Sequence, residues 1–121
     1  MEANQSVSVL ELTLFKHSES SFIRALDEAG IAHSRASMYV TGPQASGFKE
    51  IISAVSDAMP WNAIAKVMKA WIDARASREV MIQTKDGEVI HAKGYSPEEL
   101  KKVLPLSQSV MIIDTKPDKG S

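Results

Sequence analysis

Several segments that the sequence pattern predicts as strands carry apolar side chains on both of their faces. In the segment 110–113, Val110 and Ile112 point to one side of an extended chain, and Met111 and Ile113 point to the other. A half-buried antiparallel strand instead alternates apolar with polar residues. We therefore expect either that helices cover both faces of the sheet or that a partner covers one of them.

The rest of the pattern predicts an α+β fold, in which helices pack on one mixed sheet of four or five strands. The expected order is strand-helix-strand-helix-helix-strand-strand-helix-strand. The strands are expected at 7–16, 35–40, 79–84, 88–92 and 110–113. The helices are expected at 18–30, 47–59, 61–76 and 96–104. With 121 residues we expect a single domain over 1–115 and a disordered tail over 116–121.

The segment 47–59 has the apolar spacing of an amphipathic helix. Its stripe recurs at i, i+3, i+4, i+7 and i+11 and consists of Phe48, Ile51, Ile52, Val55 and Met59. Pro60 follows this stripe, and proline is tolerated in the first turn of a helix but not in its interior. We expect two helices that meet near Pro60, with a single kinked helix as the alternative.

The dipeptide Asp86-Gly87 predicts a β-hairpin, because a two-residue type I′ turn needs positive φ at both central positions. A loop of this length fixes the register of the two strands. It places His91 opposite Ile82, near a core face, and it places Ile90 on the other side together with Met81.

The segment that begins at Ser96 carries the signal of a helix start. Ser96 can cap the helix, Pro97 suits the first helical position, and Glu99 completes a capping box. Glu98 and Glu99 could be mistaken for a catalytic pair, but carboxylates in a first turn are stabilised by the helix dipole. We read both as structural.

Composition and charge exclude several classes of function. The formal net charge is -1, from 14 basic and 15 acidic residues, whereas a nucleic-acid module usually shows a strong basic excess. The chain has no cysteine, which excludes disulfides and thiolate chemistry. It has neither a charge-free window for a membrane span nor the basic start of a signal peptide. We expect a cytoplasmic protein without a cofactor, since the nucleotide and metal motifs are absent.

The remaining polar candidates are scattered along the chain. His17, His33 and His91 fall on separate predicted elements, so only tertiary structure could assemble a metal site from them. We expect His91 to be a partly buried histidine with a backbone partner. Arg75 and Arg78 lie near the end of a predicted helix, where they either bind a phosphate or carboxylate or complement the helix C-terminus.

The region 63–104 resembles a known family. The segment 63–75 ends in Ala-Trp-Ile-Asp-Ala-Arg, a hairpin turns at Asp86-Gly87, and the segment 95–104 begins Tyr-Ser-Pro-Glu-Glu-Leu. These patterns are similar to those of the effector-associated constant component family of bacterial conflict systems. The resemblance implies a small non-enzymatic partner that is encoded beside variable effectors and acts by protein interaction. It implies no particular binding residue, and it does not extend to the N-terminal half.

Two functions from different classes follow from these observations. The first is a protein-interaction module, an accessory or immunity-type partner of a bacterial effector or toxin, which binds that protein or a second copy of itself as a homodimer. Its candidate interaction residues are Met81, Ile90, Met111, Ile113, Arg75 and Arg78. The alternative is a small enzyme or ligand-binding domain whose pocket uses His91, Arg75 or Arg78. The lack of a clustered ionisable set favours the first.

Overall fold

The computed structural model describes residues 6–35 and 47–117. Their strands form one six-stranded mixed sheet in the order β2-β3-β1-β6-β4-β5. Neighbouring strands are antiparallel except for β1 and β6, which are parallel. The strands are β1 (Val7–Lys16), β2 (Ser34–Arg35), β3 (Gly47–Val55), β4 (Arg78–Thr84), β5 (Val89–His91) and β6 (Ser107–Asp114). The α+β class is confirmed, with six strands instead of the four or five expected.

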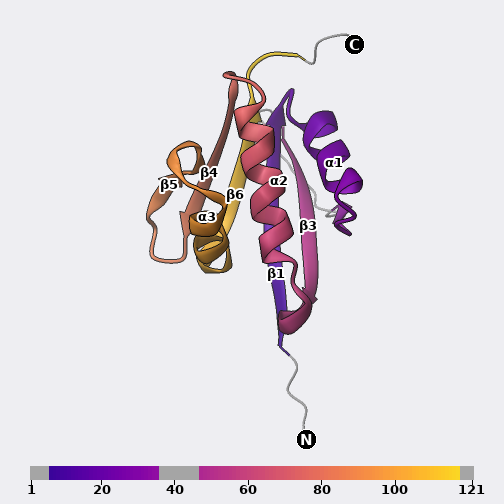
Figure 1. Ribbon diagram of the computed structural model, residues 1–121, viewed down its shortest axis with the longest axis vertical. Helices are drawn as coiled ribbons and strands as arrows, with labels where there is room; N and C mark the ends of the chain where they lie inside the picture. Colours follow the sequence, from indigo (N-terminus) through magenta and orange to yellow (C-terminus); the bar gives the residue numbers. More distant parts are fainter. Residues whose placement is uncertain (1–5, 36–46, 118–121) are drawn as a thin grey trace, which may run out of the picture.

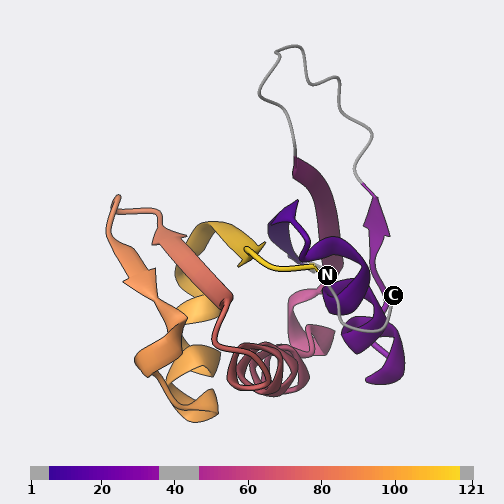
Figure 2. The same ribbon diagram turned by 90° about the horizontal axis from the view of Figure 1, so that it is seen from above.

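The α-helices of the described residues pack on one side of the sheet. Figure 1 looks at this side, with α2 in front of β1, and Figure 2 shows the helices gathered on a single side of the strands. The α-helices are α1 (Glu19–Glu28), α2 (Trp61–Asp73) and α3 (Pro97–Val103), and the short 3-10 helices are η1 (Ser56–Ala58), η2 (Ala92–Gly94) and η3 (Leu104–Leu106). None of the α-helices in the described part of the chain covers the opposite face.

The core lies between the sheet and this helix layer. Strand β1 supplies Leu10, Leu12 and Leu14, all of which are buried. Their parallel and antiparallel neighbours on β6 and β3 include Val110 opposite Leu12 and Ile52 opposite Leu10. Because side chains alternate along a strand, the odd-numbered residues of β1 point to the other face. The two-sided apolar pattern of β1 is thus split between a covered and an uncovered face.

The segment 47–59 is not a helix, and this prediction was wrong. Residues 47–55 form β3, which pairs with β1 from Val55 opposite Val7 to Gly47 opposite Phe15. A short apolar run such as Ile51-Ile52 fits a strand as well as a helix, and β-branched residues favour the strand. Long-range pairing with β1 decides between them, so a kinked helix is excluded as well. Pro60 is the N-cap residue of α2.

The hairpin is present, but its predicted register was wrong by one residue. The Gly87 amide donates to the Thr84 carbonyl over 2.9 Å, and the Thr84 amide donates to the Glu88 carbonyl over 2.8 Å. The loop therefore has three residues and ends on Gly87 at φ +89°, the arrangement common in loops of this length. A shift of one residue exchanges the two faces of a strand.

The corrected register places Ile90 opposite Ile82 and His91 opposite Met81. Ile90 therefore packs against the core and does not share a face with Met81. His91 points to the uncovered face, where its side chain is 60% exposed, instead of lying near the core opposite Ile82. Its hydrogen-bond partner is the Glu79 side chain and not the expected backbone group.

The capped helix and the last strand agree with the sequence pattern. The Glu99 amide donates to Ser96 Oγ over 3.2 Å, and the Ser96 amide donates to Glu99 Oε1 over 2.9 Å, which confirms the capping box. Strand β6 is longer than the predicted 110–113. Of the predicted strand 35–40, Arg35 lies in β2 and the rest lies outside the described residues. No helix in the described ranges is long and apolar enough to cross a membrane.

Candidate functional site

The uncovered side of the sheet, which we call the open sheet face, is the main candidate site. It is defined by the strand residues whose side chains point away from the helices. These are Val7, Val9, Glu11, Thr13 and Phe15 of β1, Lys49, Ile51, Ser53 and Val55 of β3, Ser109, Met111 and Ile113 of β6, Glu79, Met81 and Gln83 of β4, and Val89 and His91 of β5.

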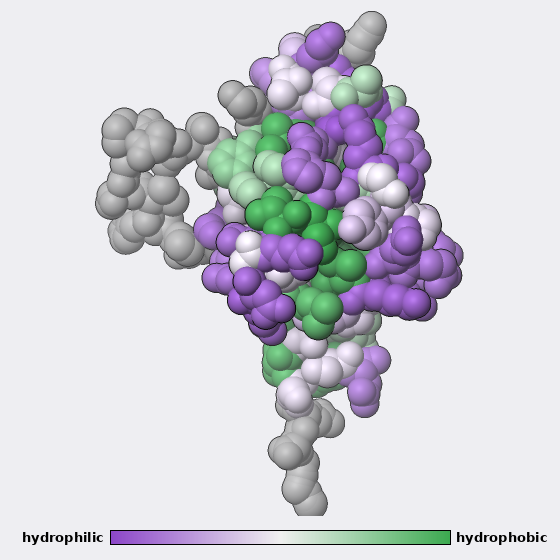
Figure 3. All heavy atoms as spheres, turned by 90° about the vertical axis from the view of Figure 1, so that its left-hand side faces the viewer, coloured by the Kyte–Doolittle hydropathy of each residue, from purple (hydrophilic) through white to green (hydrophobic). Residues whose placement is uncertain are grey.

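The centre of the open sheet face is apolar. Phe15 lies opposite Ile113 across β1 and β6, and Met111 lies opposite Met81 across β6 and β4. These four side chains are half-buried, and cross-strand neighbours on one face lie close enough to interact. We call them the apolar plate. Figure 3 looks from the β5 side and shows hydrophobic residues in a band with hydrophilic residues on either flank.

One end of the open sheet face is still more exposed. Val7 of β1 is 62% exposed, Val9 is 55% exposed, and Val55, opposite Val7, is 40% exposed. Isolated exposed apolar residues are normal, whereas contiguous apolar patches mark binding surfaces. These valines share a face with the apolar plate. The open sheet face therefore carries two apolar groups, the apolar plate and these valines, with Glu11, Thr13 and Ser53 between them.

The charged residues of the open sheet face form two pairs on its flanks. Lys49 Nζ lies 3.5 Å from Glu11 Oε2 on the β3 side, and His91 Nδ1 lies 2.5 Å from Glu79 Oε2 on the β4 side. Each acid thus has a basic partner next to it. The face therefore carries charges of both signs, and they lie on either side of the apolar plate.

The predicted interaction residues are only partly brought together. Met81, Met111 and Ile113 share the open sheet face, whereas Ile90 lies on the helix side. Arg78 is also on the helix side, since it alternates with Glu79 along β4, and Arg75 follows α2. The six residues therefore do not form one surface.

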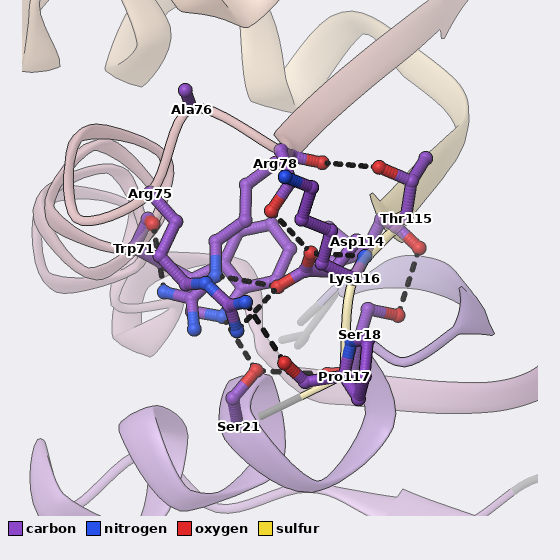
Figure 4. A network of polar contacts seen from close by, with 12 residues as sticks. Ser18, Ser21, Trp71, Arg75, Ala76, Arg78, Asp114, Thr115, Lys116 and Pro117 are labelled. Carbon is purple, nitrogen blue, oxygen red and sulfur yellow. Dashed lines mark hydrogen bonds and ion pairs between the residues drawn. The ribbon is translucent and has the colours of Figure 1, made fainter. Parts of the chain in front are cut away.

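Arg75 and Arg78 instead surround Asp114, the last residue of β6. Arg78 Nε donates to Asp114 Oδ2 over 2.9 Å, and Arg75 Nη1 lies 3.5 Å from the same oxygen (Figure 4). Arg78 Nη1 also donates to the Trp71 carbonyl in the last turn of α2, over 3.0 Å. Arg78 therefore interacts with the C-terminal end of α2, as the sequence analysis expected. The carboxylate that these arginines bind is one of the chain's own.

Further contacts complete this network at the C-terminal end of α2. Ser77 Oγ donates to Asp114 Oδ1 over 2.7 Å, and the guanidinium of Arg78 lies 4.6 Å from the centre of the Trp71 ring. Burial alone would raise the pKa of Asp114, but the hydrogen bonds and the two arginines outweigh burial and lower it. Trp71 donates from Nε1 to Ser21 Oγ of α1 over 2.9 Å. The network connects α1, α2 and β6, so its role is structural.

A second polar cluster, which the sequence analysis missed, lies at the β2 edge. His33 Nδ1 is 2.7 Å from Glu50 Oε2 of β3, and His33 Nε2 is 2.7 Å from Asp27 Oδ1 of α1. Arg35 donates from Nε to Glu50 Oε1 over 3.1 Å and from Nη2 to Glu19 Oε2 over 2.6 Å. The residues are far apart in the sequence, and no spacing signal connects them.

This cluster favours a protonated histidine. An imidazole can donate from both of its nitrogens only as the cation, and both nitrogens of His33 face a carboxylate. Burial alone would lower the pKa of His33, but the hydrogen bonds with Asp27 and Glu50 outweigh it and raise the pKa above its usual value. Within the described residues, no group of three or more histidines and acids has the arrangement of a metal site.

Comparisons of this chain with protein-family models, curated proteins and solved structures find no match.

Proposed function

We propose that the chain is a non-enzymatic protein-interaction module and that the open sheet face is its binding surface. The observation that carries this proposal is the apolar plate on a sheet face that no described helix covers. A sheet packs on another layer through apolar residues of this kind, and a contiguous exposed apolar patch is a common mark of a protein interface.

The alternative, an enzyme or ligand-binding domain, has less support from the geometry. His91 lies on the open sheet face, whereas Arg78 lies on the helix side, so the two cannot line one pocket. Arg75 and Arg78 contact Asp114, which already supplies the carboxylate that such a pair binds. The interaction proposal uses the residues that the fold does place together.

The class of partner comes from the resemblance of the region 63–104. It suggests an accessory or immunity-type protein that acts beside a bacterial effector or toxin. The proposed partner is therefore the product of an effector or toxin gene next to the gene for this chain, and an operon of metabolic enzymes would argue against the proposal.

Binding to that purified product tests the proposal. We expect Met111→Lys to abolish the complex measured by titration calorimetry, because it places a charge in the centre of the apolar plate. Lys101→Glu, a charge change at an exposed position of α3, is the control and should leave binding unchanged. Equal binding by wild type and Met111→Lys would show that the open sheet face is not the interface.

A further inference from the structure

We infer that the open sheet face is closed by a second copy of the chain, in a two-fold dimer with the two sheets packed face to face. The inference rests on the proposed function, since it takes the open sheet face to be a protein interface. It names a second copy as the occupant in the absence of the effector, which then competes with that copy for the same face. Three properties of this face support a second copy: its size, its charge and the placement of its charged flanks.

The size of the open sheet face fits a stable interface. Five strands carry it, from β3 to β5, and the four spacings of ~4.8 Å between them span roughly 19 Å. At ~3.3 Å per residue, strands of seven to ten residues are roughly 23 to 33 Å long. The projected area is therefore roughly 500 Å². Side-chain relief adds to this area and brings it toward the ~800 Å² that each partner buries in a standard interface.

The charge of the face permits self-association. A two-fold dimer brings every charge of the interface together with its own copy, so a face of one sign would repel itself. Here the face carries both signs: Lys49 lies beside Glu11, and Glu79 forms a hydrogen bond with His91. The apolar plate between these pairs can pack on an identical plate, as the inner faces of a β-sandwich do at a separation of ~10 Å.

The placement of the flanks selects the direction of the two-fold axis. An axis that runs along β1 and β6 places β3 of one copy over β4 of the other. Lys49 lies at the same level across the sheet as Met81, and Glu79 precedes Met81 by two residues on β4. Lys49 of each copy then lies beside Glu79 of the other. An axis that runs across the strands at the level of Lys49 would instead set Lys49 against Lys49, which is repulsive.

This arrangement predicts a charge-swap result that only a second copy can give. Within one chain, β1 and β6 separate β3 from β4, so Lys49 and Glu79 are about three strand spacings, or ~14 Å, apart. That separation exceeds the screening length of ~8 Å at physiological salt. A mutual rescue of changes at Lys49 and Glu79 must therefore act between chains.

Sedimentation equilibrium from low to high micromolar concentration measures the dimer. We expect Lys49→Glu and Glu79→Lys each to raise the dissociation constant about tenfold, since each places two like-charge contacts at the rim. The combined variant should return to within about threefold of wild type. Lys101→Glu is the charge-reversal control on α3, and thermal midpoints confirm that every variant is folded.

One outcome would overturn the second copy as occupant, and another would overturn the proposed axis. A wild-type chain that is monomeric at all concentrations excludes the dimer, and a combined variant that is no better than either single variant excludes the proposed axis. If the chain is monomeric and Met111→Lys still abolishes effector binding, the proposed interaction module is supported and the dimer is not. If Met111→Lys changed neither self-association nor effector binding, both proposals would fall.

Discussion

Arg78 and Asp114 form an ion pair in which the carboxylate is fully buried and the guanidinium side chain is only 9% exposed, with Nε donating to Oδ2 over 2.9 Å. They are the paired residues at one end of the β4 and β6 ladder. The pair therefore joins two neighbouring strands and, through the Trp71 carbonyl, the end of α2. It gives this end of the sheet a fixed position relative to the helix layer.

Removal of one partner of this pair should be costly. We expect Asp114→Ala to lower the free energy of unfolding by about 3 kcal/mol or more, because it leaves the guanidinium of Arg78 buried without its carboxylate. Urea denaturation measures the change. Asp57→Ala, at an exposed position of η1, is the control and should stay within about 0.5 kcal/mol of wild type. Similar midpoints for the two variants would show that the network does not stabilise the fold.

The hairpin turn gives a second prediction about stability. Gly87 has φ +89°, and a Cβ placed on it meets no atom within 4 Å, so a side chain there acts through backbone strain alone. We expect Gly87→Val to cost ~1 kcal/mol or more. Gly94 has the same open space without a positive φ, so Gly94→Val is the matched control with a smaller cost. A thermal midpoint of Gly87→Val equal to that of Gly94→Val would contradict the turn assignment.

The capping box of α3 predicts the effect of a single hydroxyl. Ser96→Ala removes the acceptor for the Glu99 amide and should lower the free energy of unfolding by about 1 kcal/mol. Ser96→Asp keeps an acceptor at the N-cap, so its free energy of unfolding should stay close to that of wild type. An unchanged urea midpoint for Ser96→Ala would mean that the capping hydrogen bond contributes nothing measurable.

The His33 cluster predicts how stability depends on pH. The pKa of His33 is raised in the folded chain above the 6.5 of an ordinary histidine, so the folded state binds this proton more tightly than the unfolded state. The stability that the cluster contributes is complete below the unfolded pKa and is lost as pH rises through the folded pKa. We expect the free energy of unfolding of wild type to fall over that range more steeply than that of His33→Gln.

Nuclear magnetic resonance titration of the His33 ring is the direct check of this pH dependence. Glu50→Gln keeps the shape of the acceptor but removes one negative charge beside the ring, so it should lower the pKa of His33. A His33 titration that Glu50→Gln leaves unchanged would contradict the proposed imidazolium between two carboxylates.

The sequence predicts the elements whose signals are local. Strand β1 follows from its alternating leucines, and α3 follows from the Ser96 capping box, since both depend on residues close together in the chain. The segment 47–59 was misassigned because its apolar spacing fits both periods until β1 pairs with it. The hairpin register was misassigned because one loop residue exchanges the two faces of β5.

The candidate site was predictable only in part for the same reason. The two-sided pattern of 110–113 placed Met111 and Ile113 on one face of a strand, and it raised the question of what covers that face. Which face the helices cover depends on the topology of the whole sheet. The contacts between His33 and Glu50 and between Arg78 and Asp114 join elements distant in the sequence, so no local pattern reports them.

Oxidative footprinting of the methionines tests most directly whether the open sheet face is a protein interface. Met81 and Met111 lie on that face and are half-buried, whereas Met68 of α2 is fully buried in the core and serves as an internal control. We expect Met81 and Met111 to be oxidised in the dilute chain and protected as concentration rises or the effector is added, with Met68 protected throughout. Equal oxidation of Met81 and Met111 under all of these conditions would contradict the account.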